Sequence, residues 1–288
     1  MKYRINHVTT YRYTSPVVLS HNLVHLALRD TPGQRVTTST LTIQPEPSSC
    51  TPITDAFGNR QTLFAIQGAH RELQVAAIGE ATVTGVTPPT HDHPWVEVAK
   101  RLQKPPNAYD LAAAEFAFAS PLCPISPDLK KFALDCLRKD DVIVGATRLS
   151  STIHRDWRYD PAATTISTPV SEVLQQRAGV CQDFAHLAIS ALRSCGLAAR
   201  YVSGYLETDP PPGTVKLRGA DASHAWFQIY LPDYGWYDLD PTNDCHPEAR
   251  HITCAYGRDF SDVSPTRGLI LGGGRADISV MVDVDRIG

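Results

Sequence analysis

Three residues far apart in the sequence carry side chains suited to nucleophilic catalysis: Cys181, His224 and Asp240. A thiol attacks a carbonyl as its thiolate, a histidine can take up and return a proton, and a carboxylate can hold the histidine ring in one orientation. Any single cysteine is better explained as a buried structural residue, because cysteine is among the most buried residue types. Together, the three residues indicate a thiol enzyme if the fold brings them to one point.

The segment around Cys181 predicts that its thiol lies at the start of a helix. Gly179 allows a sharp turn before the cysteine, and the helical pattern that begins at Cys181 ends at Gly196, a typical helix stop. The first N–H groups of a helix have no intrahelical partner, and the helix dipole favours negative charge there. Both effects stabilise a thiolate, and the same N–H groups can bind the oxyanion of a tetrahedral intermediate.

His224 and Asp240 are predicted to lie on the two strands of one hairpin. Strand-like sequence runs to Tyr230, and the turn sequence Leu-Pro-Asp-Tyr-Gly separates it from the strand that ends at Asp240. Counting back from the turn places His224 within about two residues of the point opposite Asp240, where cross-strand side chains approach to ~5 Å. Asp238 shares that face but lies about 7 Å nearer the turn, so Asp240 is the expected partner. A one-residue shift in register would reverse the faces.

The motifs Gly-Val-Cys-Gln-Asp-Phe-Ala-His, His-Ala-Trp and Asp-Leu-Asp-Pro-Thr-Asn, in this order, resemble those of bacterial transglutaminase-like proteins, a branch of the papain-like cysteine enzymes. The resemblance extends to the early run His-Val-Thr-Thr-Tyr-Arg-Tyr, to Asp-Ala-Phe-Gly-Asn at 55–59 and to a closing segment at 257–268. It implies that Cys181 is the nucleophile, His224 the base and Asp240 its orienting group. The implied reaction is acyl transfer or hydrolysis at an amide bond of a protein or peptide, such as a glutamine side chain, through a thioester. No cofactor and no metal is implied.

Residues near these motifs are weaker candidates for a role. The resembling family carries aromatic residues before the cysteine at the spacing of Trp157 and Tyr159, which makes both candidates for a second oxyanion donor. Gln175 and Gln176 are weaker candidates for the same role. Asp183, on the first turn of the nucleophile helix, is expected to be structural or to support the catalytic residues. For all of them, core packing or a solvated helix face is the competing interpretation.

The surrounding sequence predicts an α+β protein with a papain-like, transglutaminase-like catalytic domain in which helices pack on an antiparallel sheet. Residues 1–88 have short strand-like runs separated by turn signals, which indicates a small β-rich sandwich or barrel. A proline-rich stretch places a linker at 89–104. Residues 105–265 begin with helical patterns and end with strands, and form the predicted catalytic domain. Residues 266–288 are expected to be a C-terminal strand segment.

Composition and charge argue against several kinds of partner. The net charge of −3 offers no electrostatic footprint for nucleic acid or for an anionic membrane. The N-terminus lacks the apolar core of a signal peptide, and no stretch reaches the roughly 20 apolar residues of a spanning helix. The 7 cysteines are odd in number and show no Cys-x-x-Cys pair. We therefore expect a cytoplasmic protein with reduced thiols.

Other functions stay open at the level of the sequence. One is a cysteine protease of the same fold, and another is a peptide-binding module that keeps the cleft without turnover. A zinc hydrolase is a further alternative, because Cys245, His246, His251 and Cys254 lie close together in the sequence. Adjacent residues such as Cys245 and His246 cannot easily both reach one ion, which argues against the zinc site. No calcium-loop pattern is visible, so we expect a calcium-independent enzyme.

Overall fold

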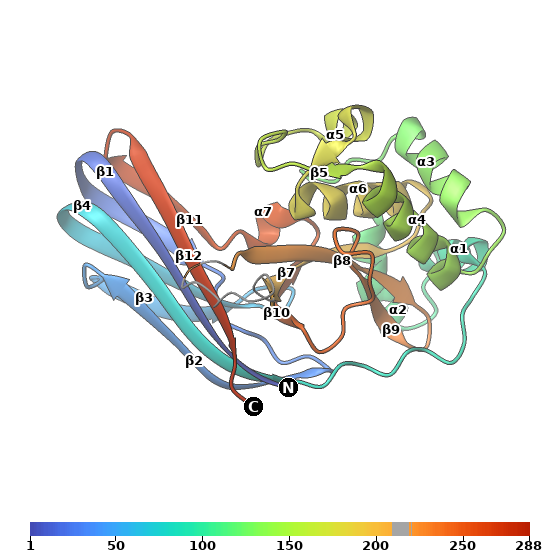
Figure 1. The fold of residues 1–288 in the computed structure, drawn as a ribbon, viewed down its shortest axis with the longest axis horizontal. Coiled ribbons are helices and arrows are strands. Elements are labelled where there is room, and N and C mark those ends of the chain that lie inside the picture. The colour runs from blue at the N-terminus through green and yellow to red at the C-terminus, as the bar shows by residue number, and fades with distance from the viewer. Residues whose placement is uncertain (209–218, 220) are drawn as a thin grey trace, which may run out of the picture.

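The computed structural model describes residues 1–208, 219 and 221–288. Figure 1 shows two lobes: a long sheet that contains both ends of the chain, and a second sheet covered by helices. The two ends lie side by side, since the Lys2 amide donates a hydrogen bond to the Gly288 carbonyl at 2.6 Å. The helices and antiparallel sheets confirm the predicted α+β class with a β-rich N-terminal region.

The first lobe is built on two long antiparallel strands, β1 and β4, which pair over most of their length. Its strands are β1 (Lys2–Val24), β2 (Gln34–Gln44), β3 (Ser49–Thr54), β4 (Arg60–Val83), β11 (Thr266–Gly272) and β12 (Ala276–Arg286). Phe64 and Val75, in the two halves of β4, share one buried cluster with Tyr13 of β1. The expected short strands are therefore segments of longer ones. The turn signals predicted at 31–33 and 57–59 lie between strands, and β1 itself has an irregular pairing between Arg12 and Val17.

The C-terminal strands return to the first lobe. β12 pairs with the first half of β1, and β11 pairs with its second half. The expected strand segment at 266–288 therefore completes the edge of the N-terminal sheet, as the red strands beside β1 in Figure 1 show.

The second lobe begins earlier than predicted. The linker was expected over 89–104, but α1 starts at Trp95 because Val98, Ala99 and Leu102 bury an apolar face in the main core. The helices of the lobe are α1 (Trp95–Gln103), α2 (Ala108–Ala114), η1 (Glu115–Ala117), α3 (Pro127–Leu137), α4 (Val142–Asp156), α5 (Val170–Gln176), α6 (Cys181–Ser194) and α7 (Phe260–Val263). Within the described residues, no helix combines the length and apolar character needed to cross a membrane.

The helices pack on a four-stranded antiparallel sheet with the order β10-β7-β8-β9. These strands are β7 (Ala199–Leu206), β8 (Ser223–Leu231), β9 (Gly235–Leu239) and β10 (His251–Gly257). A separate parallel pair, β5 (Arg158–Tyr159) with β6 (Ala178–Gly179), lies directly before α6. Helix α6 is buried along almost its whole length and lies against the four-stranded sheet (Figure 1). Helix α6 and the four-stranded sheet thus pack together and position the residues at their ends.

Two side-chain amides of the first lobe hold the edge strand β10 of the second. Gln34 bonds the Thr253 backbone in both directions, donating at 2.8 Å and accepting at 2.9 Å. Asn59 does the same with Tyr256, donating at 2.6 Å and accepting at 2.9 Å. The exposed edge of a sheet is normally left with unpaired backbone groups, and these side chains satisfy them. The N-terminal lobe therefore fixes the strand that begins at His251.

Candidate active site

Cys181 is the first residue of α6, and Asp183 shapes the turn that presents it. The Asp183 carboxylate accepts hydrogen bonds from the Val180 amide at 2.8 Å and the Thr164 hydroxyl at 2.6 Å. A Cβ atom on Gly179 would lie 2.7 Å from the same carboxylate, so only glycine fits beside it without a shift. Burial raises the pKa of Asp183, although both hydrogen bonds act against this. Asp183 therefore fixes the turn that leads into α6.

The N-terminus of α6 keeps its free backbone donors at the thiol. The N-cap residue is Val180, whose side chain has no acceptor for a backbone N–H. Among the described residues, no group accepts a hydrogen bond from the amides of Cys181 and Gln182. Unsatisfied N–H groups at a helix start attract negative charge. This arrangement can stabilise both a thiolate and an oxyanion formed next to it.

His224 lies on β8 and is bonded to Asp240. Its Nε2 atom is 2.7 Å from Asp240 Oδ2, and the exposed fractions of the two side chains are 9% and 0%. Burial lowers the pKa of His224, but hydrogen bonds to Asp240 and Cys181 outweigh it and raise the pKa to about 10. The imidazole is therefore a cation at neutral pH. Because Nε2 of His224 is hydrogen-bonded to Asp240, Nδ1 is the ring nitrogen that can interact with the thiol.

Neighbouring side chains hold the His224 ring in place. The ring stacks on Trp226 with a centroid separation of 6.0 Å. Opposite His224 on β7 is Gly204, where an added Cβ would lie 2.7 Å from the Trp226 ring. The Trp226 indole in turn donates to Asp238 at 2.7 Å. The tryptophan can approach β7 this closely because Gly204 has no side chain.

Asp240 accepts hydrogen bonds from several neighbouring groups of the site. Its Oδ2 atom accepts from His224, from His251 at 3.0 Å and from the Asn243 side chain at 2.7 Å. Its Oδ1 atom accepts from the Thr242 amide at 2.8 Å. Burial raises the pKa of Asp240, but the hydrogen bonds from both histidines outweigh it and hold the pKa well below its usual range. Asp240 is therefore an anion that faces the His224 cation.

The hairpin register explains why Asp240 and not Asp238 meets His224. Phe227 pairs with Leu239, and continuing this register puts Asp240 opposite Trp226, two residues from His224. Asp238 is instead taken up by the Trp226 indole. The spacing predicted from the sequence agrees with this geometry.

His251 is the residue that sequence reasoning did not connect with the site. It lies at the start of β10 and contacts Asp240 through Nε2, whereas its buried Nδ1 has no hydrogen-bond partner among the described residues. In the sequence, His251 lies among Cys245, His246 and Cys254, which made it part of a candidate zinc cluster. The only signal for its role was its short distance in sequence from Asp240.

The zinc cluster suggested by the sequence does not assemble. His246 stacks on Tyr237 at 4.4 Å, and burial raises the pKa of Cys245 and of Cys254 to about 12. In the described part of the chain, the three side chains whose ligand atoms do come within 4.8 Å of one another are His224, Asp240 and His251. In that group both imidazoles are already hydrogen-bonded to the carboxylate.

The aromatic candidates for a second oxyanion donor have different environments. The Trp157 indole N–H donates to the Val173 carbonyl at 2.8 Å within the core, so it is not available at the thiol. Tyr159 is 54% exposed. It pairs with Gly179, two residues before Cys181. Burial and then the charge of Cys181 raise the Tyr159 pKa.

The remaining candidates lie away from these contacts. Gln175 is exposed on α5, and the Gln176 side chain donates to the Ala178 carbonyl at 3.4 Å. All 7 cysteines of the sequence are free thiols, of which Cys181 is half-buried and Cys50 is exposed.

Comparison with other proteins gives two family matches. Residues 3–82 match the bacterial transglutaminase-like N-terminal region, and residues 131–241 match the transglutaminase-like superfamily. An uncharacterized protein of Mycobacterium tuberculosis is 38% identical over 98% of this chain and 92% of its own length. A protein-glutamine gamma-glutamyltransferase of Pseudomonas aeruginosa is 29% identical over 35% of this chain and 16% of its own length.

One solved structure has the same fold over nearly the whole chain. It is a protein of Cytophaga hutchinsonii that is assigned provisionally as a cysteine protease. The TM-score is 0.75 at 21% identity, covering 99% of this chain and 90% of that one. At this identity the similarity is one of fold.

Proposed function

The chain belongs to the transglutaminase-like superfamily, and from this premise we propose that it catalyses acyl transfer at amide bonds through a thioester on Cys181. The observation that carries the proposal is the buried His224 ring, whose Nε2 lies 2.7 Å from Asp240 Oδ2 and whose pKa is raised by Asp240 and by the Cys181 thiol. A positive imidazole beside a thiol stabilises the thiolate, which is the form that attacks.

The proposed reaction has two halves. The Cys181 sulfur attacks the amide carbonyl carbon, and the backbone N–H groups at the start of α6 bind the oxyanion. The C–N bond then breaks, His224 gives its proton to the leaving amine, and a thioester remains on the sulfur. An incoming amine or a water molecule gives a proton to His224, attacks the thioester carbonyl and releases the thiolate. Asp240 keeps the ring oriented and stabilises its charge throughout.

The substrate that we propose is the side-chain amide of a glutamine in a protein or peptide. The Pseudomonas aeruginosa relative is named for γ-glutamyl transfer from protein glutamine, and its match covers part of this chain. With an amine as acceptor the product is a new amide, and with water it is a carboxylate. Cleavage of a backbone amide by the same steps, as in a cysteine protease, is the alternative.

Labelling tests the nucleophile first. Iodoacetamide at limiting concentration and near neutral pH should alkylate Cys181 much faster than Cys50, an exposed cysteine of the same chain that serves as an internal reference. The His224→Gln variant should bring the two rates close together. Equal rates in the unmodified chain would contradict an activated thiol and favour a peptide-binding module.

Turnover tests the reaction itself. The chain is incubated with a glutamine-containing peptide, with and without a primary amine, and both the peptide products and the mass of the protein are followed. We expect ammonia release and an acyl adduct on Cys181 that is lost on treatment with hydroxylamine. Peptide-bond cleavage without ammonia release would assign proteolysis instead. The Cys181→Ala variant is the control that should show neither.

We also propose that the protein works in the cytoplasm without calcium or another cofactor. Support for this comes from the free thiols and from the lack of a calcium-loop pattern. Fractionation of cells with an antibody against the chain tests the location. Loss of turnover on chelation, with recovery on adding calcium, would contradict the second part.

A further inference from the structure

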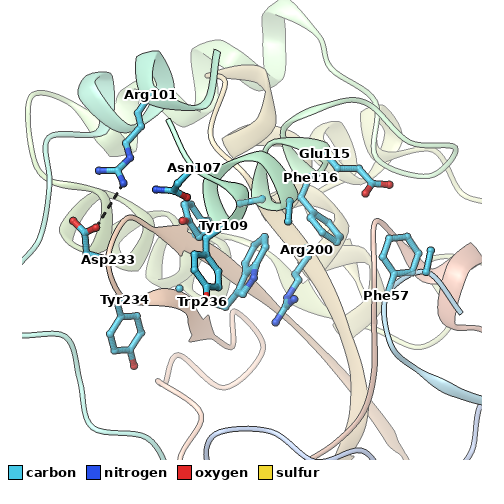
Figure 2. A pocket seen from close by; sticks show the side chains of 15 residues that line it. Phe57, Arg101, Asn107, Tyr109, Glu115, Phe116, Arg200, Asp233, Tyr234 and Trp236 are labelled. Atoms are coloured by element: carbon cyan, nitrogen blue, oxygen red, sulfur yellow. Dashed lines mark ion pairs between the residues drawn. The ribbon is translucent and has the colours of Figure 1, made fainter. Parts of the chain in front are cut away.

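A cavity separate from the catalytic residues lies where the two lobes meet. Its volume is about 640 Å³, which is within the range of small-molecule sites. Figure 2 shows its walls, which come from Phe57 of the first lobe, from α2 and η1, and from the β8–β9 hairpin. Tyr230, one of its lining residues, is six positions from His224 along β8, or ~20 Å at the rise of an extended strand. The cavity is therefore a second site.

Aromatic rings form one continuous wall of this cavity. Phe57 and Phe116 lie with ring centroids 5.6 Å apart, and Phe116 meets Trp236 edge-on at 5.2 Å. Tyr230 also packs on Trp236, with ring centroids 5.5 Å apart. Rings at these distances offer flat apolar surfaces against which another ring can pack.

Arg200 lines the same cavity with a charge that has no ion-pair partner among the described residues. Its guanidinium lies between the Trp236 and Tyr256 rings, at 4.1 and 3.8 Å from their centroids, and Nε donates to Gln228 at 2.7 Å. In the described part of the chain no carboxylate lies within ion-pair distance of it. The buried Asp238 carboxylate, which accepts a hydrogen bond from Trp226, acts on its charge without forming an ion pair with it. Burial lowers the pKa of Arg200 to about 10, so it remains a cation at neutral pH. Charged groups removed from water are normally paired.

The other charged lining residues differ from Arg200. Arg101 is paired with Asp110 at 2.9 Å and lies 3.6 Å from Asp233. Glu115 is exposed at the rim and helps to raise the pKa of Arg258. Among these lining residues, Arg200 is thus the cation without a direct ion pair, which a ligand carboxylate could supply.

We propose that this cavity binds a small aromatic molecule that carries a carboxylate. The ring packs against Phe116 and Trp236, and the carboxylate accepts hydrogen bonds from the two terminal nitrogens of Arg200. Guanidinium groups bind carboxylates in this two-point manner, and stacking on both faces of Arg200 holds its edge ready for it. The site is independent of the reaction proposed for Cys181.

The test compares an acid with its neutral analogue. Binding of 2-naphthoate and of 2-naphthamide to the full chain is measured by calorimetry or by ligand-observed NMR. We expect the acid to bind at least tenfold more tightly than the amide. We expect Arg200→Gln to remove this difference while Arg200→Lys keeps part of it. Arg177→Gln is the matched control, because Arg177 also lies over a tryptophan ring, at 5.4 Å from Trp157, but outside the cavity.

A second variant keeps the test decisive if Arg200 is needed for folding. Ala112 lines the cavity from an exposed position on α2, so Ala112→Trp should fill the space without touching Arg200, and binding of both probes should fall at least tenfold. Equal affinity for acid and amide, no binding of either at millimolar concentration, or full binding by Ala112→Trp would overturn the proposal. Much tighter binding of a peptide that ends in phenylalanine with a free carboxylate would reassign the site to a peptide C-terminus.

Discussion

The Nε2 atom of His251 lies 3.0 Å from Asp240 Oδ2, the same oxygen that accepts the hydrogen bond from His224. Two imidazoles therefore share one carboxylate oxygen, and they reach it from different strands. His224 comes from β8, next to the β9 strand that leads to Asp240, whereas His251 comes from β10 on the far side of β7. The hydrogen bond from His251 fixes the orientation of the Asp240 carboxylate, and this carboxylate in turn orients His224.

Replacing His251 should reduce turnover without removing the nucleophile. Loss of one charge-assisted hydrogen bond to Asp240 is worth ~1.5–3 kcal/mol, so His251→Phe is expected to lower kcat by about tenfold or more. His251→Gln, whose amide can still donate, should recover part of the rate. Steady-state kinetics check this, with thermal unfolding of each variant as the control for stability. Equal rates in the Phe and Gln variants would contradict a role through the hydrogen bond.

The alkaline side of the pH profile should report on His224. Its pKa is raised to about 10, so the imidazolium that protonates the leaving amine persists below that pH and is lost as the pH rises through it. We expect kcat to fall with an apparent pKa near 10 and not near 7. In Asp240→Asn the fall should move to lower pH, because the negative charge that raises the His224 pKa is gone.

The matched control for this prediction is Asp238→Asn, the same change two residues away on the same hairpin. Asp238 bonds Trp226 and not His224. The pH at which kcat falls on the alkaline side should therefore be the same in Asp238→Asn as in the unmodified chain. An NMR titration of the His224 ring gives the same comparison without turnover. If Asp240→Asn leaves the His224 titration unchanged, the coupling between the two residues is refuted.

Tyr159 should contribute to the oxyanion site through its hydroxyl alone. Removing one oxyanion donor typically costs a factor of about 100 or more in kcat, although a partly exposed tyrosine should give less, on the order of tenfold. We expect Tyr159→Phe to lower kcat while the rate of Cys181 alkylation, which needs no oxyanion site, stays the same. A parallel loss of both rates would indicate that Tyr159 acts on the thiolate instead.

Gly179→Ala should disturb the turn before the nucleophile. The added Cβ would lie 2.7 Å from the Asp183 carboxylate, which must then release the Val180 amide or the Thr164 hydroxyl. Overpacking of this kind costs ~1–3 kcal/mol of stability. We expect a lower urea midpoint and slower alkylation of Cys181. Val180→Ala, one residue further on, introduces no new atoms and should affect both measurements less.

The sequence by itself determined the local parts of this site. A helix start at Cys181 follows from the glycine before it and the helical pattern after it, and both lie within a few residues. The relation of His224 to Asp240 follows from one short turn, because a two-strand hairpin transmits its register along the chain. The order of helices before strands likewise predicted the α+β class.

Only the tertiary structure decided which distant groups complete the site. His251 reaches Asp240 because β10 pairs with β7, and Gln34 and Asn59 from the other lobe hold that strand. Such contacts join residues about 200 positions apart, as in Asn59 and Tyr256 with a separation of 197, and no local pattern specifies them. Trp157 illustrates the same limit, since its spacing suits an oxyanion donor but its N–H is used in the core. Strand pairing between distant segments and competition for hydrogen-bond partners are properties of the folded chain.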